Sequence, residues 1–248
     1  MKAMILAAGL GTRLRPLTND RPKALVEING HTLLEITLSR LRTFGVRKVI
    51  INLHHFADMV VEYLQANDNF GMRIEISREQ ALLDTGGGLK KAAHFFLGDA
   101  DELNQPFILH NVDVISTIDL RHMVQFHVEH HALATLAVQD RETSRYLLFD
   151  EQLQLCGRRH GRDGVPELAR PSPQGQALAF SGIHVISSRI FDMIPEEGAF
   201  SIINSYLRLA AGRDKILAFR ADEYYWLDLG RPENVARAAQ DFKDKVLS

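Results

Sequence analysis

Residues 3–18 read AMILAAGLGTRLRPLT, and this segment is the most informative one about the fold. It begins with a short apolar run, residues 3–7, which leads into glycines and therefore suits a buried β-strand better than a helix. The small residues that follow let backbone N–H groups approach an anion closely, and Arg13 and Arg15 supply positive charge and bidentate donors beside them. The simpler alternative is a glycine turn with two solvated arginines.

The rest of the first half alternates short apolar runs with longer amphipathic stretches. Strands that alternate with helices in this way predict βαβ units and a mostly parallel sheet covered on both faces. In such sheets ligands bind beyond the carboxyl ends of the strands, so functional residues are expected in the loops that follow them. Strands are predicted at 46–53, 72–77, 107–110 and 132–138, and helices at 32–44, 56–64, 89–97 and 120–130.

The pattern changes after residue 140, where the chain becomes rich in short strand-like segments and turn residues. This half is expected to form an antiparallel side-sheet or lid joined to the same core. The elements predicted are a hairpin of 147–149 and 154–156, an exposed loop at 158–173, a strand at 177–186 and a helix that opens at Pro232 and runs to about Val246.

Composition excludes several classes of protein. Apolar residues make up 46% and charged residues 24%, as in an ordinary globular protein, and the formal net charge of −2 gives no basic field for nucleic acid. Cys156 is the only cysteine, which rules out an intrachain disulfide framework and a cysteine-rich zinc site. The apolar N-terminus is too short for a signal peptide or a membrane span. We expect a cytoplasmic monomer or homodimer with no nucleic-acid or membrane partner.

The glycine-rich loop matches neither common nucleotide-binding fingerprint. The third glycine of G-x-G-x-x-G falls on Leu14, and G-x-x-x-x-G-K-[ST] has no match. A dinucleotide oxidoreductase is therefore disfavoured. Downstream, Pro22 fixes φ and directs Lys23, a compact charge that can neutralise a phosphate. A lone lysine is ordinarily a solvated surface residue. Lys23 is a candidate phosphate-binding residue because it lies in the same connected loop as Arg13.

Two consecutive segments carry a family resemblance. LAAGLGTRLRPLT (6–18) followed by RPKALVEING (21–30) resembles the signature of the sugar-1-phosphate nucleotidyltransferases, also called nucleotide-sugar pyrophosphorylases. Within this family, the short form of the sequence found here is most similar to bacterial N-acetylmuramate-1-phosphate uridylyltransferases and to mannose- or heptose-1-phosphate guanylyltransferases. The later segments that resemble family motifs, in the family's order, are EQALLDTGGG (79–88), NVD (111–113), FSGI (180–183) and WLDLG (226–230).

The resemblance implies a fold and an activity. The implied fold is Rossmann-like, a mostly parallel, mixed sheet flanked by helices with a small antiparallel sugar-side subregion. The implied activity is Mg²⁺-dependent transfer of a nucleotidyl group from a nucleoside triphosphate to a sugar 1-phosphate, with UTP and N-acetylmuramate 1-phosphate as the expected pair. We expect one domain, residues 1–248, with a nucleotide-binding half (1–140), a sugar-binding half with a lid loop (141–230) and a C-terminal helix (231–248).

Carried over position by position, the resemblance also implies site residues. Arg13 and Lys23 take catalytic roles on the phosphates, and Asp113 and Asp228 bind Mg²⁺. The sugar-binding residues are Ser181, Gly182 and Trp226, and the nucleotide-binding residues are Leu6, Ala8, Gly9, Gly11, Thr12, Arg13, Glu79, Gly86, Gly87 and Asn111.

The metal assignment can also be argued from chemistry. Mg²⁺ prefers a few carboxylates together with substrate phosphates and water, and two aspartates at the ends of separate strands fit that preference. The alternatives are that Asp113 caps the helix that starts near Asp119, or that Asp228 makes a turn. Val112 stands where the family usually has glycine, so this turn must differ or use an ordinary β conformation.

The reaction itself requires no general base. A sugar 1-phosphate is mostly dianionic at neutral pH and can attack the α-phosphorus directly, so catalysis depends on positioning and on cations. Glu79 faintly favours guanine, because a carboxylate accepts from guanine N1 and N2 but only from uracil N3, whereas the overall resemblance favours uridine. A non-catalytic nucleotide-sugar-binding module remains an alternative. His127 and His131, four residues apart, are interpreted as a solvated or half-buried pair rather than a zinc site.

Overall fold

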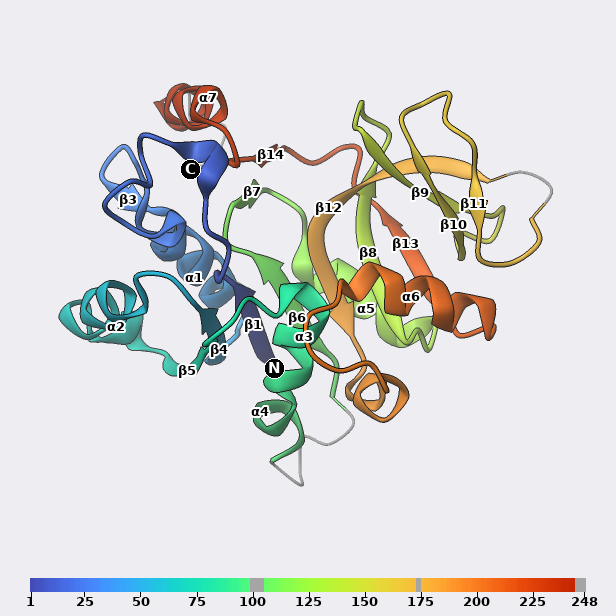
Figure 1. Ribbon diagram of the computed structural model, residues 1–248, viewed down its shortest axis with the longest axis horizontal. Helices are drawn as coiled ribbons and strands as arrows, with labels where there is room; N and C mark the ends of the chain where they lie inside the picture. Colours follow the sequence, from blue (N-terminus) through green and yellow to red (C-terminus); the bar gives the residue numbers. More distant parts are fainter. Residues whose placement is uncertain (99–104, 173–174, 244–248) are drawn as a thin grey trace. The chain divides into compact units, whose positions relative to one another are not determined.

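Strand β1 (Lys2–Leu6) is the predicted strand at the start of the chain, here seen in a computed structural model that describes residues 1–98, 105–172 and 175–243 (Figure 1). It lies parallel to β4 (Lys48–Leu53), which lies parallel to β5 (Arg73–Arg78). On the other side of β1 comes β6 (Phe107–Asn111). The central strands β1 and β4 are almost wholly buried and nearly continuously apolar, as expected for parallel strands.

The chain forms two units that alternate along the sequence. The first unit comprises Met1–Leu82, Leu109–Ile118 and Tyr224–Ser248, and the second comprises Leu83–Ile108 and Asp119–Glu223. The predicted division into a nucleotide-binding half that ends at residue 140 and a sugar-binding half that ends at residue 230 describes which ligand each half binds. It does not correspond to these units and stays a prediction.

Helix α1 (Leu33–Thr43) shows how local sequence sets an element in the first unit. The Thr32 side chain caps it by accepting a hydrogen bond from the backbone N–H of Glu35, and Gly45, with φ at +85°, follows its end. The buried stripe includes Leu34, as the spacing predicts. The unit also contains α2 (Ala57–Ala66), α7 (Pro232–Lys243), the antiparallel pairs β2 (Glu27–Ile28) with β3 (His31–Thr32) and β7 (Val114–Ser116) with β14 (Trp226–Asp228), and short 3₁₀ turns at Thr12–Leu14, Lys23–Leu25 and Asp68–Gly71.

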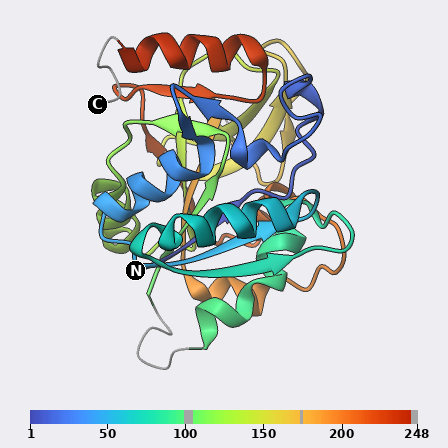
Figure 2. The same ribbon diagram turned by 90° about the vertical axis from the view of Figure 1, so that its left-hand side faces the viewer.

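Figure 2 shows helix α7, in red, running alongside β14. The contact is held by polar groups as well as by packing. The hydroxyl of Tyr225 donates to the Asp241 carboxylate at 2.5 Å, and the Asn234 side chain donates to the carbonyl of Asp228 at 2.6 Å. Burial and the Asp241 carboxylate together raise the pKa of Tyr225 well above its ordinary value, so this phenol remains a donor. The C-terminal helix therefore fixes β14, which carries Asp228.

The second unit is built around β12 (Gln176–Ile186). This long strand lies antiparallel to β8 (Ala134–Gln139) on one side and to β9 (Arg145–Phe149) on the other, while β13 (Ile216–Arg220) runs parallel to β8. Strands β10 (Leu155–His160) and β11 (Glu167–Leu168) extend the β9 side in antiparallel fashion. The helices are α3 (Asp84–Lys91), α4 (Ala93–Leu97), α5 (Leu120–Glu129) and α6 (Ile202–Ala211), with a 3₁₀ segment at Ser188–Met193.

Two predicted elements need correction. The helix expected at 89–97 begins at Asp84 and is divided into α3 and α4, so the three glycines lie inside a helix rather than before it. Part of the loop expected at 158–173 is strand, because β10 runs to His160 and β11 pairs with it. Gly157 permits this pairing, since a Cβ there would lie 2.5 Å from the Glu167 carbonyl oxygen. Residue 173 and the predicted helical residues 244–246 lie outside the described part of the chain.

The fold class predicted from the sequence is confirmed. A Rossmann-like arrangement of parallel strands flanked by helices occupies the first unit, and the hairpin of β9 and β10 belongs to the predicted antiparallel part. No helix in the described ranges is both long and apolar enough to cross a membrane. The cytoplasmic location and the choice between monomer and homodimer stay predictions.

Candidate active site

The loop after β1 turns back on itself at Gly11. This residue has φ at +64°, in the left-handed region that glycine adopts without strain, and its carbonyl accepts from the Thr18 hydroxyl at 2.8 Å. A Cβ on Gly11 would lie 3.0 Å from a Thr18 methyl carbon and 3.3 Å from Lys23 Cβ. Gly9 is different, because nothing lies within 4 Å of its Cβ position. The loop is closed against its own chain at Gly11 and open at Gly9.

Lys23 lies next to this loop and is paired with a predicted metal ligand. Its ammonium forms an ion pair with the Asp113 carboxylate, and the side chains are 12% and 14% exposed. Pro22, with φ at −70°, precedes the 3₁₀ turn that holds Lys23. The positive charge therefore sits in a largely buried position beside a carboxylate rather than in solvent.

Asp113 and Asp228 lie on neighbouring segments of the first unit. Strands β7 and β14 pair so that Asp228 is opposite Val114, and the Leu229 N–H donates to the Asp113 carbonyl at 2.8 Å. The cap of helix α5 is Asp119, which accepts from two backbone N–H groups, so Asp113 has no capping role there. The alternative in which Asp228 stabilises a turn is correct in part, because Asp228 Oδ1 accepts a hydrogen bond from the Gly230 N–H at 2.6 Å.

Arg13 lies against the turn that follows Asp228. A Cβ at Gly230 would be 2.9 Å from Arg13 Nη2 and 2.6 Å from Asp228 Oδ1. Only a residue without a side chain fits between this guanidinium and this carboxylate. Sequence reasoning quoted Gly230 within a motif but did not identify it as a site residue. The first unit thus brings together all four predicted catalytic and metal-binding side chains: Arg13, Lys23, Asp113 and Asp228.

Val112 adopts no positive φ, as its β-branched side chain predicts. Val112 is buried and is not among the described residues with positive φ, and its N–H donates to the Leu6 carbonyl at 3.1 Å. This bond links the ends of β1 and β6. Asn111 is half-buried at the end of β6, where its carbonyl bonds the His110 ring at 2.8 Å. Val112 lies in the turn between β6 and β7, and a β-branched residue fits there because this turn requires no positive φ.

Glu79 follows β5 and is only 5% exposed. Its Oε1 accepts from Asn52 Nδ2 at 2.7 Å, and Asn52 Oδ1 accepts from the Ala7 N–H at 2.8 Å. Sequence reasoning missed Asn52. The available signal was a polar residue near the end of an otherwise apolar strand, where a buried amide needs partners.

Gly86 and Gly87 lie in α3 of the second unit, where the chain itself occupies the space next to them. A Cβ on Gly86 would be 2.3 Å from the Phe200 ring, and one on Gly87 would be 2.2 Å from the Gly198 carbonyl oxygen. The Gly86 N–H also donates to the Phe200 carbonyl at 2.8 Å. Packing within the unit thus accounts for both glycines, and their contact with a nucleotide stays a prediction.

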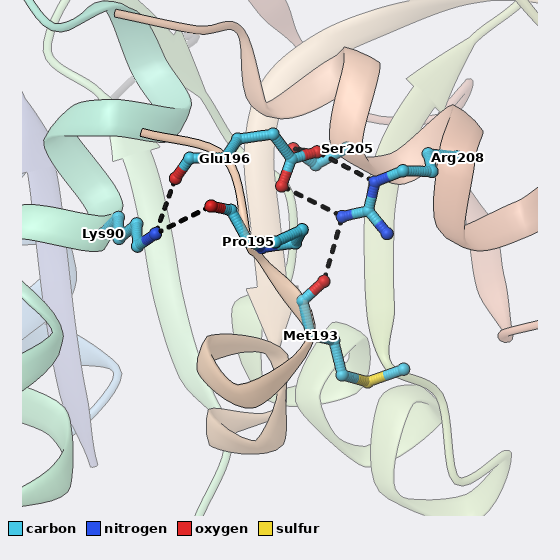
Figure 3. A network of polar contacts seen from close by, with 6 residues as sticks. All are labelled: Lys90, Met193, Pro195, Glu196, Ser205 and Arg208. Atoms are coloured by element: carbon cyan, nitrogen blue, oxygen red, sulfur yellow. Dashed lines mark hydrogen bonds and ion pairs between the residues drawn. The ribbon is translucent and has the colours of Figure 1, made fainter. Parts of the chain in front are cut away.

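A polar network holds the segment that packs on these glycines (Figure 3). Lys90 Nζ donates to the Glu196 carbonyl at 2.6 Å, and Arg208 donates to both Glu196 carboxylate oxygens at 2.9 and 3.0 Å. Ser205 adds a third donor to that carboxylate. Although partial burial raises the pKa of Glu196, the hydrogen bonds from Arg208 and Ser205 bring it below its ordinary value.

The predicted sugar-side residues lie in both units. Ser181 and Gly182 form an irregularity in β12, where pairing with β8 jumps from Phe180 to His184 and Gly182 has φ at +74°. Such bulges re-aim side chains and are common beside active sites. Trp226 is in the first unit, half-buried on β14 and two residues before Asp228. Their contact with a sugar stays a prediction.

Within the described residues, no cluster of three or more His, Cys, Asp and Glu side chains could hold a metal ion. His127 is buried, and its Nδ1 bonds the Thr135 hydroxyl at 3.0 Å, so it is more deeply buried than the solvated or half-buried position expected for it, whereas His131 is exposed. Asp113 and Asp228 remain as a pair of carboxylates. Two carboxylates fit Mg²⁺, which takes its remaining ligands from substrate phosphates and water.

Comparison with known proteins gives a consistent result. Residues 2–245 match the family model described as nucleotidyl transferase. The chain is 35% identical over 243 residues to N-acetylmuramate alpha-1-phosphate uridylyltransferase of Caulobacter vibrioides, an alignment that covers 93% of this chain and 92% of the relative. It is 28% identical to mannose-1-phosphate guanyltransferase of Yarrowia lipolytica, covering 94% of this chain but 62% of that protein.

Solved structures show the same fold. HddC from Yersinia pseudotuberculosis, complexed with GMP-PN, has a TM-score of 0.75 at 24% identity, with 97% of this chain and 99% of that chain covered. A putative glucose-1-phosphate thymidylyltransferase from Bacillus anthracis has a TM-score of 0.79 at 19% identity, with 98% and 96% covered.

Proposed function

This chain belongs to the nucleotidyl transferase family and is a sugar-1-phosphate nucleotidyltransferase, and from that premise we propose that it transfers a uridylyl group from UTP to N-acetylmuramate 1-phosphate. The products are the uridine diphosphate sugar and pyrophosphate. The similarity to the Caulobacter vibrioides enzyme, which extends over nearly the whole of both chains, supports this choice of substrates.

The observation that carries the proposal is the convergence of two cations and two carboxylates in the first unit. Lys23 contacts Asp113, Arg13 lies against the turn after Asp228, and paired strands join the two aspartates. A module that only bound a nucleotide-sugar would gain little from two carboxylates held beside phosphates. Asp113 and Asp228 would hold Mg²⁺, which when bound supplies positive charge to the phosphates.

The chain's own residues position and neutralise the reacting groups. An oxygen of the sugar phosphate forms the new bond to the α-phosphorus, and the bond to the bridging oxygen breaks as pyrophosphate leaves on the opposite side. Arg13 and the backbone N–H groups of residues 8–12 hold the β- and γ-phosphates. Lys23 turns from the Asp113 carboxylate to a phosphate oxygen and offsets the charge that develops there.

A second pair of substrates is supported by one observation. Glu79 is a carboxylate that already accepts a hydrogen bond, so it is suited to the N–H donors of a base, of which guanine offers N1 and N2 together. The alternative is therefore a guanylyltransferase that uses GTP with mannose or heptose 1-phosphate. The similarity to mannose-1-phosphate guanyltransferases supports it as well.

A substrate matrix tests the proposal. Four nucleoside triphosphates are combined with a panel of sugar 1-phosphates, with and without Mg²⁺, and pyrophosphate release is measured. The proposal predicts release only with both substrates and Mg²⁺, and the highest kcat/KM with UTP and N-acetylmuramate 1-phosphate. Preference for GTP would establish the alternative. Binding of a nucleotide-sugar in calorimetry without turnover of any pair would contradict both.

A further inference from the structure

Asn52 connects two parts of the first unit that follow different strands. Strand β4 lies between β1 and β5, and Asn52 is opposite Leu6 on one side and Ser77 on the other. Ala7, the first residue of the glycine loop, follows β1, and Glu79 follows β5. The Asn52 side chain is 3% exposed and bonds both, at 2.8 Å to the Ala7 N–H and at 2.7 Å to Glu79 Oε1.

The chemistry of these partners fixes the orientation of the amide. The Ala7 N–H can only donate, so the Asn52 oxygen must face it, and the NH₂ group must then face Glu79. Aspartate at this position could accept from Ala7 but could not donate to Glu79. Because both bonds are buried, loss of either partner leaves a polar group unsatisfied.

We propose that Asn52 is a positioning residue that couples the glycine loop after β1 to Glu79, so that the triphosphate and the base of the nucleotide are bound together. The inference rests on the proposed function in that Glu79 is taken to face the base. Its consequence is specific to one substrate. Disturbing Asn52 weakens binding of the nucleoside triphosphate and leaves the KM for the sugar 1-phosphate unchanged.

A double-mutant cycle tests the coupling. Asn52→Asp keeps the acceptor for Ala7 but sets a carboxylate against the Glu79 carboxylate, and we expect the KM for the nucleoside triphosphate to rise about tenfold. In the Glu79→Gln background the same change should have little effect, because Gln at 79 donates to Asp at 52 and the bond is restored with reversed polarity. Asn67→Asp, which alters an exposed amide that bonds only locally to the Tyr63 carbonyl, is the matched control.

Two results would overturn the inference. The first is an equal rise in KM from Asn52→Asp in both backgrounds, and the second is a lowered melting midpoint with an unchanged KM. If Asn52→Asp fails to fold, the doubly substituted protein is compared with Glu79→Gln alone, and unequal KM values contradict the coupling. If the wild-type protein turns over no substrate pair, the proposed function fails, and the same cycle is measured as the Kd for UTP and GTP by calorimetry.

Discussion

The two glycine segments of this chain, GLG at 9–11 and GGG at 86–88, are both predicted to bind nucleotide, but they owe their glycines to different causes. In the first, Gly11 takes a left-handed conformation and the Cβ position of Gly9 meets nothing within 4 Å. In the second, Phe200 and Gly198 already occupy the space beside Gly86 and Gly87. The first segment leaves room for a ligand, and the second leaves room for the protein's own backbone.

A run of glycines therefore indicates that no side chain fits at those positions, but it does not indicate whether a ligand or the protein itself occupies the space. Substitutions in the first segment and at the charged residues beside it should reduce activity while the fold persists. Substitutions in the second segment and in its supporting network should destabilise the fold first. Paired variants in the two regions test this contrast.

The largest effect is expected from the two lysines that support the two regions. Lys23→Gln should lower kcat by about a hundredfold to a thousandfold, as removal of a preorganised donor does, with little change in the melting midpoint. Lys90→Gln removes a hydrogen bond to the Glu196 carbonyl and should lower the midpoint while turnover is retained. Pyrophosphate release and thermal melting of both variants measure the contrast, which fails if both lysines affect the same quantity.

Alanine substitutions at the glycines should show the same contrast in stability between the two regions. Gly87→Ala places a methyl group 2.2 Å from the Gly198 carbonyl oxygen and should destabilise the protein by about 3 kcal/mol. Gly9→Ala meets open space and should change the free energy of unfolding by about 0.5 kcal/mol or less. Urea denaturation at pH 7.5 measures both. Equal stability of the two variants would contradict the assignment of Gly87 to packing.

A pH titration compares the units, since each contains a buried histidine. Burial lowers the pKa of His110 and of His127 to about 4, so both rings stay neutral in the folded protein while the unfolded chain binds protons near pH 6.5. Stability is therefore full above pH 6.5 and falls as the pH drops toward 4. At pH 5 we expect a loss of about 2 kcal/mol from each histidine.

His127→Gln separates the two contributions, because glutamine can still bond Thr135 but does not titrate. Between pH 7.5 and pH 5 the histidines lower the unfolding free energy of the wild-type protein. In the variant this histidine-dependent decrease should be about half as large. Urea denaturation at the two pH values measures it. An unchanged decrease would show that His127 is not buried as a neutral ring.

The smallest effect is expected at the Glu196 carboxylate. Glu196→Gln weakens its ion pair with Arg208, whose side chain is 44% exposed, and should destabilise the second unit by about 1 kcal/mol or less. Asp20→Asn weakens the pair with Arg21, in which the Asp20 side chain is 74% exposed against 27% for Glu196; it is the control and should have no measurable effect. A larger loss at Asp20 than at Glu196 would contradict the role given to the network.

Local pattern predicted much of the fold because local chemistry determined it. Helix α1 begins after Thr32 and ends before the glycine at 45, and the apolar run at the start of the chain forms β1. Asp113 and Asp228 were singled out on chemistry and resemblance, and strand pairing brings them to neighbouring positions. Each of these features lies within one segment or follows from a strand end.

The features that were missed depend on register between distant strands or on packing across a unit. Asn52 matters because β4 lies between two strands whose loops both need its amide, and Gly230 matters because Arg13 lies against it. The helix expected at 89–97 left out the glycines at 86–88, yet they lie inside α3, where Phe200 packs against Gly86. No window of sequence contains such partners.

Whether the charged groups of the first unit act as one catalytic centre can be measured by pyrophosphate release from Asp113→Asn, Asp228→Asn and the doubly substituted protein. Residues that act as a unit are non-additive, so the doubly substituted protein should be no slower than the slower single variant. Asp58→Asn, at an exposed carboxylate, should match the wild type. Multiplied losses in the double variant would instead show two independent sites and contradict the account.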